Sequence, residues 1–67
     1  MNTQTTIIMK TYIYTTWTSK EAKRSNLLFY SSGKLNANEL VEVQHKGSEF
    51  IRYYTEDKFN HIFKLNQ

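Results

Sequence analysis

The sequence predicts a small single-domain α+β fold in two layers, with an antiparallel sheet packed by one helix. Three observations carry this prediction: a strand-like segment near the start, a capping box that opens a helical segment, and two further strand-like segments joined by a short loop. The expected order is strand, helix, strand, strand and a final short helix or strand. A chain of 67 residues is too short for two cores, so we expect one domain over 1–67, with 1–5 as a candidate flexible tail.

The composition narrows the class of protein. There is no cysteine, so neither a disulfide nor a thiolate metal site can add to the core. Aromatic residues make up 15% of the chain and bury a large area each. No stretch approaches the length of about 18 apolar residues that spans a membrane, and the start lacks the basic segment and cleavage site of a secretory signal. We therefore expect a cytoplasmic protein, with Met9 as an alternative native start to Met1.

The segment Thr6 to Trp17 is rich in Ile, Tyr, Thr and Trp and is expected to form the first strand. Successive side chains of a strand point to opposite faces. The face predicted to meet the core carries Met9, Thr11, Ile13, Thr15 and Trp17. The other face carries Lys10, Tyr12, Tyr14 and Thr16. Two tyrosines and a lysine are unusual on a plain solvent face, so this second face is the first candidate for function.

A capping box predicts the start of a helix. In the motif TSKE, Thr18 to Glu21, the first side chain caps the backbone of the last residue and the glutamate reaches back. The helix is expected to run to about Tyr30 or Ser31, with Gly33 near the left-handed position that ends it. Polar residues interrupt its apolar stripe, so the alternative is a short helix to Asn26 followed by a strand over LLFYSS.

The segments Leu40 to His45 and Glu49 to Tyr54 are predicted to form two strands joined by a loop at 46–48. That loop length gathers the β-branched residues on one face and opposes two charges of opposite sign on the other. The pairs on the first face are His45 with Glu49, Val43 with Ile51 and Val41 with Tyr53. The pairs on the second face are Gln44 with Phe50, Glu42 with Arg52 and Leu40 with Tyr54.

The last segment, Thr55 to Gln67, fits two structures. A threonine followed by two acids is typical of a helix N-terminus, and the helical face is then shared by Phe59, Ile62 and Phe63. As a strand, the segment alternates equally well through Phe59, His61, Phe63 and Leu65. We expect a short helix, with a strand as the alternative.

The residue pattern does not predict catalysis. Neither histidine lies at a recognised catalytic spacing from a carboxylate. His45 and His61 are sixteen residues apart and form no metal-binding pattern, and the two glycines form no phosphate loop. We expect no enzyme activity, no cofactor and no metal site, and His45 is interpreted as a structural residue beside Glu49.

Positive charge is concentrated in the first half of the chain. Residues 1–34 hold five basic residues against one acidic residue, whereas residues 35–67 hold four against five. The basic residues of the expected helix and its end are Lys20, Lys23, Arg24 and Lys34. A solvated helix face is the ordinary interpretation of such a set, and contact with nucleic-acid phosphates is the functional alternative.

If the first strand and the hairpin share one sheet, the face turned away from the helix gathers aromatic rings and two cations. Its members are Lys10, Tyr12, Tyr14, Phe50, Arg52 and Tyr54. Three interpretations compete. The rings could stabilise a thin sheet as cross-strand pairs, or form an exposed surface that binds a partner. They could also form a second core, closed by the C-terminal segment through Phe59, Ile62 and Phe63.

The leading hypothesis is a non-enzymatic binding protein that uses this aromatic face to occupy a surface of a larger protein or complex. An inhibitor or accessory factor works in this way, and the short, cysteine-free chain, rich in Asn, Lys, Thr, Ile and Tyr, resembles small accessory proteins of phages and mobile elements in composition. The alternative is direct nucleic-acid binding through the basic helix, with tyrosines stacking on bases. No proline protects the sheet edges, so a homodimer by edge pairing is a third hypothesis.

Overall fold

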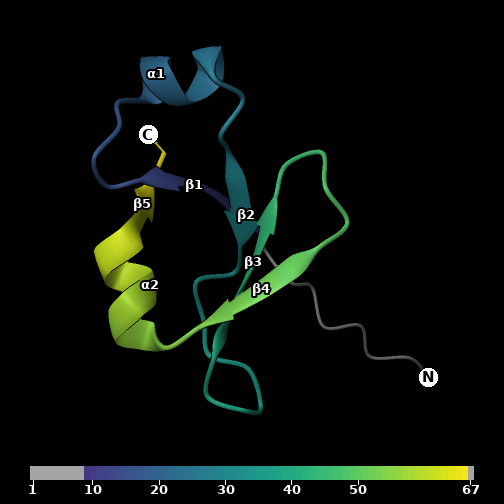
Figure 1. Ribbon diagram of the computed structural model, residues 1–67. Coiled ribbons are helices and arrows are strands. Elements are labelled where there is room, and N and C mark those ends of the chain that lie inside the picture. Colours follow the sequence, from purple (N-terminus) through teal and green to yellow (C-terminus); the bar gives the residue numbers. More distant parts are fainter. Residues whose placement is uncertain (1–8, 67) are drawn as a thin grey trace, which may run out of the picture.

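The computed structural model describes residues 9–66, which form a five-stranded sheet and two helices (Figure 1). The strands lie in the order β4-β3-β2-β1-β5, and each neighbouring pair is antiparallel. The elements are β1 Lys10–Tyr14, α1 Ser19–Arg24, β2 Phe29–Ser31, β3 Val41–His45, β4 Ile51–Tyr54, α2 Glu56–Ile62 and β5 Phe63–Leu65. The predicted small α+β fold with an antiparallel sheet is confirmed, with two strands more than the expected order contained.

The first strand is shorter than the predicted Thr6 to Trp17. It ends at Tyr14, whose carbonyl oxygen accepts a hydrogen bond from the Trp17 amide at 3.1 Å, so the chain turns there. Residues 6–8 of the predicted strand and the candidate tail over 1–5 lie outside the described part of the chain.

The capping box predicted at the start of α1 is present. The Glu21 amide donates to Thr18 Oγ1 at 3.2 Å, and the Thr18 amide donates to Glu21 Oε1 at 2.9 Å. Hydrogen bonding to the Glu21 carboxylate, first from the Thr18 backbone amide and then from the Thr18 side chain, holds the pKa of this carboxyl below its usual value. The capping-box motif in the sequence was therefore sufficient to predict where α1 begins.

The end of α1 differs from the prediction. The helix stops at Arg24 because Asn26 adopts a left-handed backbone conformation, with φ of 56°, and the Leu27 amide donates to the Ala22 carbonyl oxygen at 2.9 Å. The long helix to Tyr30 or Ser31 is thus wrong, and the alternative of a short helix followed by a strand is correct. That strand is β2, the central strand of the sheet.

The connection between β3 and β4 is longer than the predicted three-residue loop. The Ser48 amide donates to the His45 carbonyl oxygen at 2.9 Å, and Gln44 Nε2 donates to the Ser48 carbonyl oxygen at 2.6 Å. The Phe50 amide donates to Ser48 Oγ at 3.1 Å. These bonds satisfy backbone and side-chain groups within the connection and keep residues 46–50 out of the paired strands.

The longer connection shifts the hairpin register by one residue. Gln44 lies opposite Ile51 and Val43 opposite Arg52, so the predicted pairing of Glu42 with Arg52 is wrong, and the other predicted pairs shift with it. A one-residue shift moves every side chain of one strand to the other face relative to its partner. Arg52 therefore shares its face with the buried Val43.

The tyrosine side of β1 is covered by α2 and forms the larger core; we call this side of the sheet the α2 face (Figure 1). Tyr12 is 7% exposed, and its ring meets that of Phe59 edge-on, with 4.9 Å between centroids. The buried members of this core are Tyr12, Phe29, Val41, Val43, Phe59 and Phe63. Of the three interpretations of the aromatic face, the second core closed by the C-terminal segment is correct for Tyr12, and Tyr14 and Tyr54 pack against this core.

The opposite side of the sheet, the α1 face, holds a smaller core of Ile13, Ala22 and Leu28. The sequence predicted that the main core would lie on this side, and that prediction is wrong. Of its five predicted core residues only Ile13 is buried, because α1 is six residues long and buries a single small side chain, Ala22.

The last segment contains both predicted structures in succession. Thr55 caps α2 through Oγ1, which accepts from the Lys58 amide at 3.4 Å, and acidic residues occupy the first turn as expected. Phe63–Leu65 then pairs with β1 as an edge strand, with Phe63 opposite Tyr14. The transition from helix to strand places Phe59 and Phe63 over the same core.

Gly33 follows β2 instead of ending α1, and its position yields a stability prediction. Its φ is +74°, and a Cβ there would clash with the Tyr12 hydroxyl oxygen. Gly47, with φ of +87°, has open space around it and is the matched control. In urea denaturation, Gly47→Ala should lose about 1 kcal/mol for the left-handed backbone alone. Gly33→Ala should lose about 1–3 kcal/mol more of the free energy of unfolding, because the added methyl group would overpack the core around Tyr12. Equal losses in the two variants would contradict this contact.

Burial raises the pKa of the Tyr12 phenol above its usual value of 10.0. The folded protein therefore holds this proton more tightly than the unfolded chain does. The resulting stabilisation is complete below pH 10.0 and is lost as the pH rises through the raised pKa. Urea denaturation across this alkaline range should show a smaller loss of unfolding free energy in Tyr12→Phe than in the parent. The exposed Tyr53→Phe is the control, and identical pH dependence in all three proteins would overturn the assignment.

Candidate functional site

The path of α2 leaves one corner of the α2 face uncovered. The helix begins after β4, where Tyr54 lies opposite Val41, and ends at β5, where Phe63 lies opposite Tyr14. It thus crosses the sheet from one edge strand to the other, and from one end of the strands to the other end. The uncovered corner lies where β2 begins, β3 ends and β4 begins.

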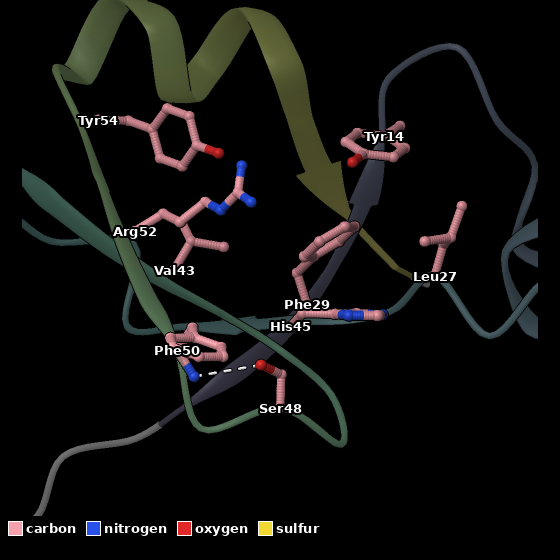
Figure 2. Close-up of a pocket in the computed structure, with 9 residues that line it drawn as sticks. All are labelled: Tyr14, Leu27, Phe29, Val43, His45, Ser48, Phe50, Arg52 and Tyr54. Atoms are coloured by element: carbon pink, nitrogen blue, oxygen red, sulfur yellow. Dashed lines mark hydrogen bonds between the residues drawn. The ribbon is translucent and has the colours of Figure 1, made fainter.

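A pocket of about 240 Å³ occupies this corner, and we call it the corner pocket (Figure 2). It is lined by Tyr14, Leu27, Phe29, Val43, His45, Ser48, Phe50, Arg52 and Tyr54. In Figure 2 the side chains of Tyr14, Phe29, Arg52 and Tyr54 point into a common space above the sheet. Residues from four strands and two connections therefore converge on one site.

The floor of the corner pocket consists of rings fixed by the core. The Phe29 ring lies 4.9 Å from Tyr14 and 5.0 Å from Phe63, centroid to centroid, and Tyr54 lies 5.4 Å from Phe63. Aromatic pairs at such distances contribute about 0.5–1.5 kcal/mol beyond their buried area. The floor is thus held in place by packing that exists without any ligand.

Arg52 is the one permanently charged side chain in the lining. It is exposed, and within residues 9–66 its guanidinium makes no hydrogen bond or ion pair. The shifted hairpin register explains this position, because it places Arg52 opposite Val43 and away from Glu42, the carboxylate that the sequence predicted as its partner. Among the described residues, the pocket therefore combines an apolar floor with one cation that has no partner.

The β3–β4 connection forms the outer rim of the corner pocket. The Phe50 side chain is 81% exposed, the largest exposure among the large apolar residues described. Across the pocket, His45 Nε2 lies 2.9 Å from the Asn26 carbonyl oxygen, to which it donates, and the His45 ring lies 5.2 Å from that of Phe29. His45 thus has a structural role, as predicted, but its pair across the strands is Phe29 and not Glu49.

Four of the six residues predicted for partner binding meet at the corner pocket, namely Tyr14, Phe50, Arg52 and Tyr54. Tyr12 is part of the closed core and offers no surface to a partner. Lys10 is exposed but pairs with Ser31 and does not line the pocket. Sequence reasoning missed Phe29 because it was assigned to the long helix; in the alternative strand over LLFYSS, it would have been placed in the sheet.

The basic residues proposed for nucleic-acid contact do not form one patch. Lys20, Lys23 and Arg24 are exposed on α1, which follows β1 at one end of the sheet. Lys34 lies in the β2–β3 connection, which emerges from the other end of β2 (Figure 1). The predicted proximity of Lys34 depended on the long helix and is lost with it.

No family model matches the chain, and no curated protein or solved structure matches it. Among residues 9–66 no cluster of three or more potential metal ligands is present. None of the described helices is long and apolar enough to cross a membrane. The chemistry of the corner pocket is therefore the basis for a functional proposal.

The corner pocket should contain residues of two kinds, those needed for folding and those free for a ligand. Phe29→Ala should reduce the free energy of unfolding by about 3–5 kcal/mol, since it removes a buried ring. Phe50→Ala and Arg52→Gln should change it by no more than about 0.5 kcal/mol. If Phe29→Ala does not fold, Phe29→Leu provides the comparison, with a loss of about 1 kcal/mol. Thermal unfolding followed by circular dichroism measures all four, and a large loss in Phe50→Ala would show that its ring is part of the core.

Proposed function

We propose that this protein is a non-enzymatic binding protein that occupies a surface of a larger protein partner through the corner pocket. The observation that carries the proposal is the exposed Phe50 beside Arg52, which has no partner within residues 9–66, above a floor of fixed rings. Aromatic and arginine side chains dominate the energetics of protein interfaces. Because the floor is held by the core, little conformational entropy is lost when a partner docks.

Binding is proposed in preference to catalysis because of the groups in the lining. It holds no carboxylate, and its single imidazole is engaged by a backbone carbonyl oxygen through Nε2. General acid–base chemistry needs a group that can exchange a proton with a substrate. Occupation of a partner's surface without chemistry is how an inhibitor or accessory factor acts. We also propose a cytoplasmic setting, since a chain without cysteine suits a reducing compartment.

Site-specific photocrosslinking tests the proposal. A benzophenone amino acid at position 50 should form an adduct with one protein in an extract of the native cells. Lys23, exposed on α1, is the control position. We expect the adduct at position 50 and not at position 23, and we expect Arg52→Gln to abolish it. No adduct at position 50, or equal adducts at both positions, would overturn the proposal.

The same experiment separates the competing functions. An adduct that nuclease removes would replace the proposal with nucleic-acid binding, and Lys20, Lys23 and Arg24 would become the residues to mutate. Such binding would also weaken steeply with salt, because phosphate contacts release counterions. An adduct of two copies of this chain would instead identify self-association.

Once the partner is isolated, its affinity should depend on the rim of the corner pocket. Phe50→Ala and Arg52→Ala should each weaken binding by about 1–3 kcal/mol, as expected for central interface residues. Lys23→Ala, an exposed change on α1, should have no effect. Isothermal titration calorimetry gives the three affinities, and equal values would exclude the corner pocket as the interface.

A further inference from the structure

The chemistry of the corner pocket selects a negatively charged group. Arg52 lines the corner pocket with Tyr14, Phe29 and Tyr54, and its own side chain is exposed, so a ligand can reach it. Within residues 9–66 the guanidinium has no counter-ion, and such a group binds a carboxylate through two parallel charge-assisted hydrogen bonds. Because Arg52 is exposed, water and salt screen part of this attraction, and the neighbouring rings add apolar contact with the ligand.

The size of the corner pocket limits what can accompany the anion. Its volume of about 240 Å³ lies below the range of about 300–1,000 Å³ that is usual for sites of small molecules and cofactors. A space of this size suits a side chain of a longer ligand. Phe50 stands at the rim and can pack against an apolar neighbour of that side chain.

The position of β4 indicates how the longer ligand would run. β4 is an edge strand, and within residues 9–66 no strand pairs with its outer side. It contains no proline, and its one charged side chain, Arg52, would repel a basic segment and favour an acidic one. An added strand would place alternate side chains beside Arg52 on the α2 face and beside Ile51 and Tyr53, both exposed, on the α1 face.

We propose that the corner pocket binds an acidic side chain of an extended partner segment that pairs with the edge of β4. An aromatic or aliphatic residue two positions from the acid lies on the same face, against Phe50, and apolar residues between them meet Ile51 and Tyr53. This inference rests on the proposed function and names the chemistry of the partner. Charge complementarity with Arg52 determines the acid in the partner segment, and the two-residue alternation of a strand determines the spacing of its apolar residues.

Selection from a displayed library of random octapeptides tests the pattern without knowledge of the partner. The full chain is immobilised, and the selected peptides are sequenced. We expect enrichment of Asp or Glu with an apolar residue two positions away. Synthetic peptides from the selected set should bind the parent at least about tenfold more tightly than Arg52→Gln. Replacement of the peptide acid by its amide should cause a loss of similar size.

Two variants control for folding and for net charge. Arg52→Lys keeps the charge but not the two parallel hydrogen bonds, so it should retain part of the affinity. Lys23→Gln removes one charge from α1, outside the pocket, and should bind like the parent. Circular dichroism verifies that each variant is folded.

Three results would overturn the inference: selection of no peptide, selection of peptides without acids, or equal affinity for the parent and Arg52→Gln. Competition with inorganic phosphate and phenyl phosphate identifies another source of the anion. If these compounds bind while acidic peptides do not, the pocket is a phosphate site. A failed selection alongside a specific protein adduct at position 50 would reject the acidic segment and retain the proposed function.

Discussion

Packing of Phe59 and Phe63 against the rings of β1 and β2 is the interaction on which the rest of the structure depends. Without it, the sheet would be held by the small core of Ile13, Ala22 and Leu28 alone. The Phe59 ring meets Tyr12 at 4.9 Å, and Phe63 meets Phe29 at 5.0 Å. In a chain of 67 residues without disulfides, a few large rings must supply much of the buried area. Because α2 must reach from β4 to β5, the same packing that closes the core also leaves the corner pocket open.

The connection between β3 and β4 decides which residues face that pocket. Hydrogen bonds from Gln44 and Phe50 to Ser48 stabilise a longer connection than a tight hairpin requires. The resulting register places Arg52 opposite Val43, on the side of the sheet that is otherwise apolar. An exposed guanidinium that has no partner among residues 9–66 contributes little to stability by itself. The shifted register accounts for where Arg52 lies, and the accessibility of this side chain to a ligand is the physical argument behind both functional proposals.

The sequence predicted those features that depend on near neighbours. The caps at Thr18 and Thr55 were correct because a capping residue acts within one turn. The placement of Tyr12 with Tyr14 on one face of β1, and of Arg52 with Tyr54 on one face of β4, was correct because alternation is a property of each strand. The predicted end of α1 and the predicted hairpin register were wrong. Both depend on individual hydrogen bonds, which the spacing of apolar residues in the sequence does not indicate. Examples are the bond from the Leu27 amide to the Ala22 carbonyl oxygen and the bond from Gln44 Nε2 to the Ser48 carbonyl oxygen. The sequence identified Phe50 and Arg52 at the rim of the candidate site. It did not indicate that Phe59 buries Tyr12 or that Phe29 lines the pocket, because both depend on tertiary packing.

Hydroxyl-radical footprinting read by mass spectrometry tests most directly the division of the aromatic face into a closed core and an open corner. The method compares the oxidation rates of side chains in the folded protein, and aromatic rings react readily when solvent reaches them. The structure predicts rapid oxidation of Phe50 and slow oxidation of Tyr12, Phe59 and Phe63. If Tyr12 and Phe59 were oxidised as rapidly as Phe50, α2 would not cover the sheet, and the corner pocket would not exist as a separate site.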